Sequence, residues 1–338
     1  MAKRTLQFEV WEECNNHCEF CYLTKDNLYT PDQIKLRGIQ NIIDSLNNKN
    51  FIKDYDAVSL IGGEFFQGQM KNPEVKAKFM EMIRLIASLQ TEGYFNETWL
   101  LVTLTIGDQK DLYEVLDTVK KIYEDAKKPE ILKKFWIITS YDTIGRFHSP
   151  KMEENWKFHM KNIHEKYPDI KFNTSIILTQ DLIVKYLNDD FSFNDFADEF
   201  NTNFFLKQPM PAIRKELDCI KFDDLEENHM WIKRECEKIL PGFLPKRSTF
   251  LEFLSKFHID CPQYYDHLFN IKYRADDLYR NRNDETEGKL DHTHRDKDSK
   301  TEQEISPRDF ISPCGHTSKY ASYIDSNACM LCDKETII

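Results

Sequence analysis

The chain has 338 residues, enough for one large domain and a smaller one. Hydrophobic residues make up 41% of it and charged residues 30%, a balance typical of soluble proteins with a sizeable core. The formal net charge of -11 gives no general attraction to nucleic acid, although it leaves room for a local basic patch. The sequence has no apolar run of the roughly 18 residues that a membrane span needs and no apolar leader, so we expect a cytoplasmic protein.

A cysteine-rich loop follows the first predicted strand. An alternating apolar run over residues 5–11 leads into Cys14, Cys18 and Cys21. Free cysteines are usually scattered and buried, so a cluster in a polar loop indicates ligation of a soft metal ion or an iron–sulfur cluster. Because four thiolates would close such a site, either a fourth ligand comes from elsewhere in the chain or one metal stays open to a substrate.

Predicted strands and helices alternate after this loop. Helix starts are marked by Thr30-Pro31-Asp32-Gln33, a capping-box arrangement, by Asn72-Pro73, by Ser149-Pro150 and by Thr179. A further helix is indicated by apolar residues at helical spacing from Leu112 to Ile122. The later strands are expected over 56–61, 99–105, 135–140, 172–178 and 203–206. Six strands with intervening helices predict an α/β fold with a parallel sheet.

Two short motifs stand at the ends of predicted strands. Gly62-Gly63-Glu64 directly follows the second strand, where a glycine pair can simply permit a tight turn. Ser140-Tyr141-Asp142 ends the fourth strand and precedes Arg146-Phe147-His148. A serine and an aspartate at this position can equally cap the following loop and helix.

The remainder of the chain changes character after residue 210. Residues 211–280 form a predicted helical extension, with helices over 223–240 and 248–257. The stretch 281–309 has few large apolar residues and mixed charge, so we expect a mobile linker or surface insertion there. His292 and His294 within it are expected to be solvated side chains.

A second cysteine group occupies residues 310–338, the predicted metal-binding tail. Its candidate ligands are Cys314, His316, Cys329 and Cys332, and Cys261 can supply a fourth thiolate. A Cys-x2-Cys pair with an upstream cysteine and a nearby histidine is typical of a four-coordinate zinc site. Cys219 and Cys236 fall in predicted helical segments and are expected to be ordinary buried residues.

The first cysteine loop resembles the signature of the radical S-adenosylmethionine (radical SAM) family, with Phe20 preceding the third cysteine. The resemblance implies that residues 1–210 form a partial (β/α)6 barrel and that Cys14, Cys18 and Cys21 hold a 4Fe-4S cluster. It also implies that the open iron binds S-adenosylmethionine, whose reductive cleavage yields a 5'-deoxyadenosyl radical. A reduced flavodoxin or ferredoxin is the implied electron donor.

The same resemblance assigns cofactor-binding residues. Phe20 and Tyr22 would pack beside the cluster and the adenine. Gly62, Gly63 and Glu64 would hold the methionine amine, and Ser140 would help to fix the ribose. The Ser-x-Asp stretch is similar to that of the peptide-modifying branch of the family, but Thr143 stands where that branch usually has glycine.

The tail also resembles, more loosely, the auxiliary-cluster extension of that branch, so either zinc or a second iron–sulfur cluster fits it. Its spacing departs from the full seven-cysteine pattern. The resemblance predicts hydrogen abstraction from a substrate, which is a peptide, a protein or a small molecule. Two alternatives remain open: a radical SAM enzyme acting on a nucleoside or nucleic acid, and a zinc-stabilised binding module. No residue is marked by the sequence as a catalytic base.

Overall fold

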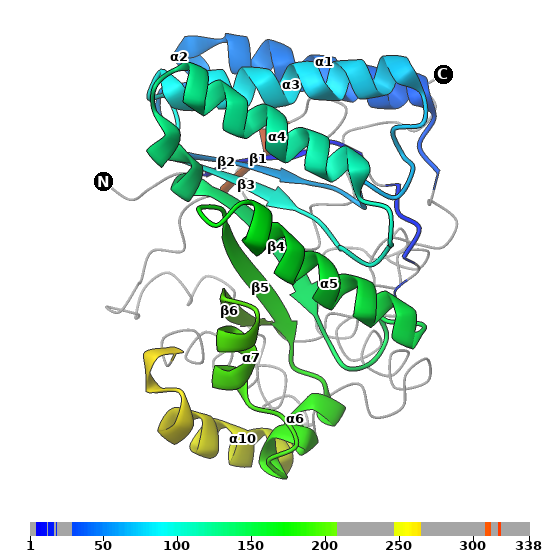
Figure 1. Ribbon diagram of the computed structural model, residues 1–338, viewed down its shortest axis with the longest axis vertical. Helices are drawn as coiled ribbons and strands as arrows, with labels where there is room; N and C mark the ends of the chain where they lie inside the picture. The colour runs from blue at the N-terminus through cyan, green and yellow to red at the C-terminus, as the bar shows by residue number, and fades with distance from the viewer. Residues whose placement is uncertain are drawn as a thin grey trace, which may run out of the picture.

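A computed structural model describes residues 5–11, 13–16, 18, 29–207, 247–264, 308–311 and 317–318. Its strands form one sheet in the order β6-β5-β4-β3-β2-β1-β7-β8 (Figure 1). The first six are β1 (Thr5–Glu9), β2 (Ala57–Ile61), β3 (Glu97–Leu101), β4 (Phe135–Tyr141), β5 (Lys171–Ile177) and β6 (Thr202–Lys207). All neighbouring pairs among these six are parallel, which confirms the predicted α/β class.

Helices fill the connections between the parallel strands. They are α1 (Asp32–Asn47), α2 (Lys49–Ile52), α3 (Pro73–Thr91), α4 (Lys110–Asp125), α5 (Pro150–Lys166), α6 (Gln180–Leu187), α7 (Phe193–Glu199) and α10 (Arg247–Asp260), with 3-10 turns over Pro129–Lys134 and Pro262–Tyr264. The long helices α1, α3, α4 and α5 lie on one side of the sheet (Figure 1). The strand order follows the chain without reversal, as in a (β/α) barrel and unlike a doubly wound sheet. The core is therefore a partial (β/α)6 barrel.

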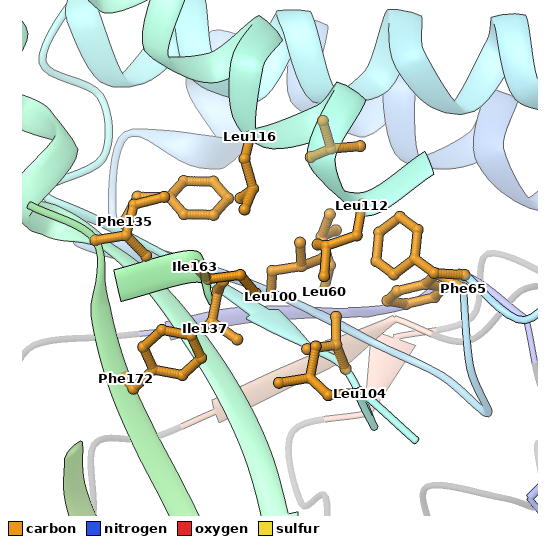
Figure 2. Close-up of a cluster of buried hydrophobic side chains, with 14 of the residues drawn as sticks. Leu60, Phe65, Leu100, Leu104, Leu112, Leu116, Phe135, Ile137, Ile163 and Phe172 are labelled. Atoms are coloured by element: carbon orange, nitrogen blue, oxygen red, sulfur yellow. The ribbon is translucent and has the colours of Figure 1, made fainter. Parts of the chain in front are cut away.

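The sheet face under the helices is apolar and fully packed. Figure 2 shows its strand residues against helix residues; the set is Leu60, Leu100, Ile137 and Phe172 from the strands and Leu112, Leu116 and Ile163 from the helices. None of these side chains is more than 2% exposed. Since burying one such side chain contributes about 1.5–3 kcal/mol, this layer fixes the sheet as a rigid platform.

The opposite sheet face carries more polar residues. Gln7, Ser59, Trp99 and Trp136 are successive partners in register across β1, β2, β3 and β4. Ser140 occupies the same face near the carboxyl end of β4 and pairs in register with Ser175. In a barrel this face is the interior, so it is the surface available to line a site.

Several predicted boundaries differ from the structure by one or more residues, and two of these differences have a clear cause. Helix α1 begins at Asp32 with Pro31 at the N-cap, and its cap has no side-chain hydrogen bond. The expected capping box fails because the N–H of Thr30 donates to Glu13 Oε2 at 3.0 Å, so the chain enters the helix one residue later. Strand β3 ends at Leu101 instead of residue 105, because the chain leaves the sheet and Leu104 adopts a left-handed φ of 59°.

Other start signals are confirmed by their hydrogen bonds. The side chain of Asn72 accepts the N–H of Glu74 at 2.9 Å, and the Thr179 hydroxyl accepts the N–H of Leu182 at 3.2 Å. Helix α10 confirms the helix predicted over 248–257, whereas the one predicted over 223–240 lies outside the described residues.

A late segment joins the sheet beside its first strand. Strand β7 (Arg308–Ile311) pairs in parallel with β1, and β8 (Thr317–Ser318) pairs antiparallel with β7. No strand is predicted in that part of the sequence. Across the ranges that the structure describes, the helices are too short or too polar to cross a membrane.

Candidate functional site

The loop that leads to the cysteines lies against the turn that follows β2. The N–H of Gly63 donates to the Trp11 carbonyl at 2.9 Å, and the N–H of Glu64 donates to the Glu13 carbonyl at 2.8 Å. A Cβ atom on Gly62 would stand only 2.4 Å from the carbonyl oxygen of Trp11. Glycine at this position therefore permits close approach of the two loops, and the Gly-Gly-Glu turn sits next to the first cysteine.

Glu64 connects the loops that follow β2 and β3. It is 2% exposed, and its carboxylate accepts the N–H groups of Phe65 at 2.8 Å, Phe66 at 3.0 Å and Thr103 at 2.6 Å. Burial raises the pKa of Glu64, and hydrogen bonds from these three residues, including the Thr103 side chain, oppose the shift. Its backbone carbonyl accepts the indole N–H of Trp11 at 2.8 Å. The carboxylate thus stabilises the turn through these hydrogen bonds. Its predicted contact with a methionine amine stays a prediction.

The residues between the first two cysteines are held by side chains from three other loops. Gln67 accepts the N–H of Asn15 at 3.1 Å and donates through Nε2 to Asn16 Oδ1. The same Asn16 oxygen accepts the hydroxyl of Thr105 at 2.7 Å, and the ring Nε2 of His148 donates to the Asn16 carbonyl at 2.7 Å. The loops after β2, β3 and β4 therefore all contact the cysteine loop at the carboxyl edge of the sheet.

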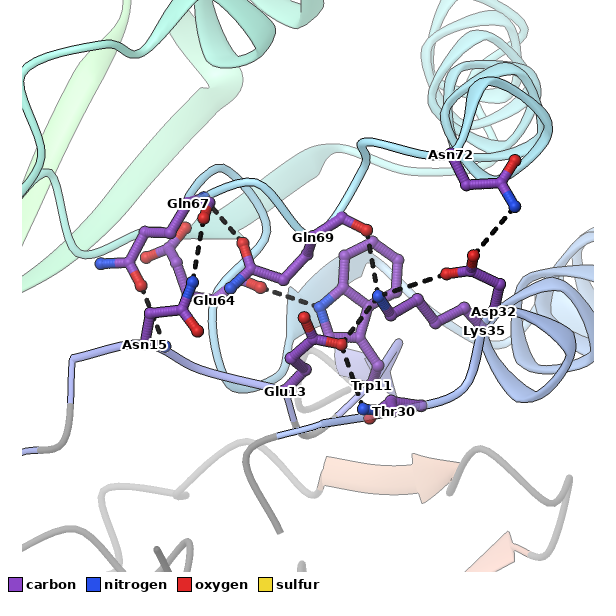
Figure 3. A network of polar contacts seen from close by, with 10 residues as sticks. All are labelled: Trp11, Glu13, Asn15, Thr30, Asp32, Lys35, Glu64, Gln67, Gln69 and Asn72. Atoms are coloured by element: carbon purple, nitrogen blue, oxygen red, sulfur yellow. Dashed lines mark hydrogen bonds and ion pairs between the residues drawn. The ribbon is translucent and has the colours of Figure 1, made fainter.

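A buried ion pair closes the base of the loop (Figure 3). Lys35 of α1, with 3% of its side chain exposed, lies 2.7 Å from Glu13 Oε2 and donates to the carbonyl of Gln69 at 3.0 Å. Glu13 also accepts the N–H of Thr30. One carboxylate therefore holds both ends of the segment between residues 14 and 29.

Two of the three predicted cluster ligands are described. Cys14 is 7% exposed and its Sγ accepts the N–H of Asn16 at 3.5 Å, while Cys18 is half-buried. Cys21, Phe20 and Tyr22 lie outside the described residues. Within the described ranges no three histidine, cysteine or acidic side chains form a metal-binding group. The predicted triad is not tested by this finding, because Cys21 lies outside those ranges.

The loop after β4 contains a buried ion pair. Asp142 is fully buried; its Oδ1 accepts the N–H of Arg146 and its Oδ2 accepts the guanidinium Nε, both at 3.2 Å. Burial raises the pKa of Asp142 to about 6, although Arg146 opposes this shift. The predicted ribose contact, Ser140, is half-buried two residues earlier. The structure thus brings Ser140 to the site edge, and its ligand role stays a prediction.

Of the predicted ligands of the second metal site, the structure describes Cys261. Cys261 is 1% exposed at the end of α10, and its thiol donates to Asn194 Oδ1 at 3.6 Å. Burial raises the pKa of Cys261 to about 11, which favours the thiol over the thiolate that a metal requires. Cys314, His316, Cys329 and Cys332 lie outside the described residues, so this site stays a prediction.

Several residues at the site carry no sequence signal. Gln67, Thr105 and Lys35 belong to no motif, and only the fold brings them to the cysteine loop. The neighbouring Asn15-Asn16 pair is visible inside the cysteine spacing, but two asparagines in a loop are ordinary. His148 follows the Ser-x-Asp stretch, and its contact with the cysteine loop was not predicted.

The residues present suit an iron–sulfur cluster. The predicted donors are thiolates, and a backbone N–H already points at Cys14 Sγ, as hydrogen bonds to sulfur do in such sites. Asn16 is 2% exposed, yet its side-chain Nδ2 has no hydrogen-bond partner among the described residues. A buried donor without a partner beside two cysteines is consistent with an acceptor-bearing group at this position.

No protein-family model matches the sequence, and no curated protein matches it. Among solved structures, the chain is similar to coproporphyrinogen III oxidase (HemN) from Escherichia coli, described as a radical SAM enzyme, with 14% identity and a TM-score of 0.44 over 78% of this chain and 53% of that one. It is also similar to a polyhistidine-tagged anSMEcpe with bound AdoMet, with 14% identity and a TM-score of 0.36 over 62% of this chain and 51% of that one. The chain therefore matches about half the length of each.

Proposed function

We propose that this chain is a radical SAM enzyme whose site lies at the carboxyl edge of the parallel sheet. The observation that supports it most is the contact of three strand-end loops with the segment between Cys14 and Cys18. Barrel enzymes build their active sites at this edge. The cysteine spacing supplies the chemistry, and the buried contacts hold the segment between two of the three proposed sulfur ligands against the strand-end loops.

In the proposed site, the thiolates of Cys14, Cys18 and Cys21 hold a 4Fe-4S cluster. When bound, this cluster supplies the electron that cleaves S-adenosylmethionine to a 5'-deoxyadenosyl radical. Gly62, Gly63 and Glu64 would hold the methionine amine, and the Glu64 carboxylate also fixes the turn through its bonds to backbone N–H groups. Ser140 binds the ribose, while Phe20 and Tyr22 pack beside the cluster and the adenine.

The test is anaerobic purification of the full chain, followed by reconstitution with iron and sulfide. We expect about four irons per chain at the first site, and release of 5'-deoxyadenosine when dithionite and S-adenosylmethionine are added. Cys18→Ala should lose that release while its circular dichroism stays unchanged, because the loop lies outside the strands. Zinc as the sole bound metal would overturn the proposal in favour of a zinc-stabilised binding module. Full 5'-deoxyadenosine release by Cys18→Ala would instead overturn the assignment of the cluster to this cysteine loop.

The proposed reaction is hydrogen abstraction from a peptide or protein. Its support is the Ser140-Tyr141-Asp142 stretch with Arg146 downstream, which is similar to the peptide-modifying branch. Comparison of peptide and small-metabolite masses in cells with the wild-type chain and with Cys18→Ala tests this directly. A mass change confined to nucleosides or nucleic acid would replace the peptide proposal and leave the radical chemistry intact.

We propose reduced flavodoxin or ferredoxin as the physiological electron donor, in place of dithionite. We also propose a second metal, zinc or an auxiliary cluster, on Cys314, His316, Cys329 and Cys332, with Cys261 as a fourth thiolate donor. Cys261→Ala then lowers the metal content of the tail and leaves the first cluster assembled. An unchanged metal content would remove Cys261 from the ligand set and leave it as a buried thiol.

A further inference from the structure

The orientation of the Asn16 side-chain amide follows from the hydrogen bond that the backbone N–H of Asn15 makes. The N–H of Asn15 can only donate, and it points at a Gln67 side-chain atom 3.1 Å away, which must therefore be the oxygen. The other terminal atom of Gln67 is then the nitrogen, a donor, and it faces Asn16. Asn16 must accept with its oxygen, which also receives the Thr105 hydroxyl at 2.7 Å. The remaining Asn16 atom is consequently an NH2 group.

That NH2 group is buried, and it has no hydrogen-bond partner among the described residues. Asn16 is 2% exposed, and no hydrogen bond from its Nδ2 is found in the part of the chain that the structure describes. Leaving a buried donor unsatisfied costs about 1–3 kcal/mol, so a folded protein rarely tolerates it. Asn16 is two residues from Cys14 and two from Cys18, and its own backbone N–H already faces Cys14 Sγ.

We propose that the Asn16 side chain donates a hydrogen bond to an acceptor on the group held by the cysteine loop, and that Gln67 is the residue that positions it. This inference rests on the proposed function. Two acceptors share the required chemistry: a sulfur of the cluster or of its cysteine ligands, and the carboxylate of S-adenosylmethionine. Hydrogen bonds to sulfur favour the more electron-rich, reduced cluster, so the donor raises the cluster potential if sulfur is its partner.

Two substitutions at Asn16 separate the effect of losing the hydrogen-bond donor from the effect of adding a negative charge. Asn16→Asp keeps an oxygen for Gln67 and Thr105 but replaces the NH2 group with a second oxygen. Asn16→Leu is neutral and of similar size, and it removes the donor without adding charge. A shift seen with Asn16→Asp alone would be the effect of its negative charge and would count against the proposal.

Gln67→Leu tests the positioning role, and the chain offers a matched control. Gln90 is also buried, at 3% exposure, and its side chain contacts Thr98 at 2.8 Å, Tyr123 at 2.6 Å and the Asn96 carbonyl at 3.1 Å. It sits near the amino end of β3, opposite to the cysteine loop. Gln90→Leu therefore reports what loss of a buried glutamine does to the fold alone.

The measurements use the full chain with its reconstituted cluster. Thermal unfolding of the protein before reconstitution gives the loss of stability in each variant. Iron release to a chelator should be about 10–100-fold faster in the Asn16 and Gln67 variants than in Gln90→Leu, as for other residues that orient metal ligands. If sulfur is the acceptor, the reduced-to-oxidised ratio at a fixed potential should fall about tenfold without S-adenosylmethionine, which corresponds to about 59 mV.

The second arm adds S-adenosylmethionine. If its carboxylate is the acceptor, the potential without it stays unchanged and its Kd rises about tenfold in Asn16→Leu. Iron release, potential and Kd all equal to those of Gln90→Leu would overturn the inference. A wild-type chain that takes up no iron would instead overturn the proposed function, so the two failures are distinguishable.

Discussion

At Gly62 two loops approach each other closely. Its neighbour across the site is the backbone of Trp11, which cannot move as a side chain can, because it continues β1 toward the first cysteine. A methyl group at Gly62 must therefore displace one of the two loops.

We expect Gly62→Ala to lower the free energy of unfolding by about 1–3 kcal/mol, the usual cost of overpacking, and to weaken retention of the reconstituted cluster. Chemical denaturation and iron analysis measure the two effects. Gly107→Ala is the control, since its Cβ would meet nothing nearer than Asn155 Oδ1 at 3.7 Å. Equal behaviour of the two variants would show that the cysteine loop tolerates displacement.

Asp142 should make stability depend on pH. Its folded-state pKa of about 6 lies above the ordinary value of 3.8, so ionisation costs the folded state more than the unfolded state. Its contribution is therefore fully present below about pH 4 and is lost as the pH rises through about 6. Two pKa units correspond to about 3 kcal/mol.

Asp142→Asn should consequently gain stability relative to the wild type as the pH rises from 4 to 7.5. Unfolding midpoints in urea at several pH values measure this difference. Asp54→Asn, at an exposed position, is the control for removal of a carboxylate. A constant difference for Asp142→Asn would mean that Arg146 compensates for burial completely.

At the scale of elements, Lys35 ties helix α1 to the cysteine loop. Its ammonium group is surrounded by Glu13, the Gln69 carbonyl and, at 3.7 Å, Asp32. The charges are nearly dry, with 3% of the lysine and 12% of the glutamate side chain exposed. Removing one partner of such a pair leaves an uncompensated buried charge.

Lys35→Met should therefore cost about 3–5 kcal/mol, and the double variant Lys35→Met/Glu13→Gln should be more stable than the single one. Denaturant unfolding of the four members of this cycle measures the coupling. Lys120 and Glu124 form an exposed pair, so Lys120→Met should change stability by less than about 1 kcal/mol. A double variant no more stable than Lys35→Met would show that the lysine acts by packing alone.

The accuracy of the sequence predictions differs between elements for a physical reason. The starts of α3 and α6 were predicted because Asn72 and Thr179 cap helices with their own neighbours. The start of α1 was missed because Thr30 is held by Glu13, 17 residues away along the chain. The end of β3 was missed for the same reason, since Glu64 of another loop binds the backbone at Thr103. Local signals are readable from sequence, and contacts across loops are not.

At the scale of the whole molecule, the same distinction separates the fold from the site. Alternating strands and helices predicted the parallel sheet, and the motifs at strand ends predicted that the proposed site lies at its carboxyl edge, where the structure brings these loops together. The residues that hold the cysteine loop, such as Gln67 and Lys35, come from other connections and have no pattern of their own. The strand β7 was also missed, because it pairs with a partner about three hundred residues earlier.

The pairing of β7 makes β1 an interior strand, and hydrogen exchange can test this. Residues Thr5, Leu6, Gln7 and Phe8 are paired with β2 on one side and with β7 on the other. We expect their amides to exchange as slowly as those of β3, because both strands are interior. In the described part of the chain β6 pairs with β5 alone, so its amides provide the reference for an edge strand.

Phe310→Pro places a proline in β7 at the position paired with Gln7, where it disfavours strand pairing, and should speed exchange in β1 while β3 and β4 stay protected. Exchange measured by mass spectrometry on short N-terminal peptides shows whether β1 behaves as an interior strand or as an edge strand. Wild-type exchange in β1 as fast as that in β6 would mean that residues 308–311 do not cover this edge in solution. If β1 exchanges slowly in the wild type and quickly in the proline variant, residues 308–311 pair in solution with the strand that leads into the cysteine loop.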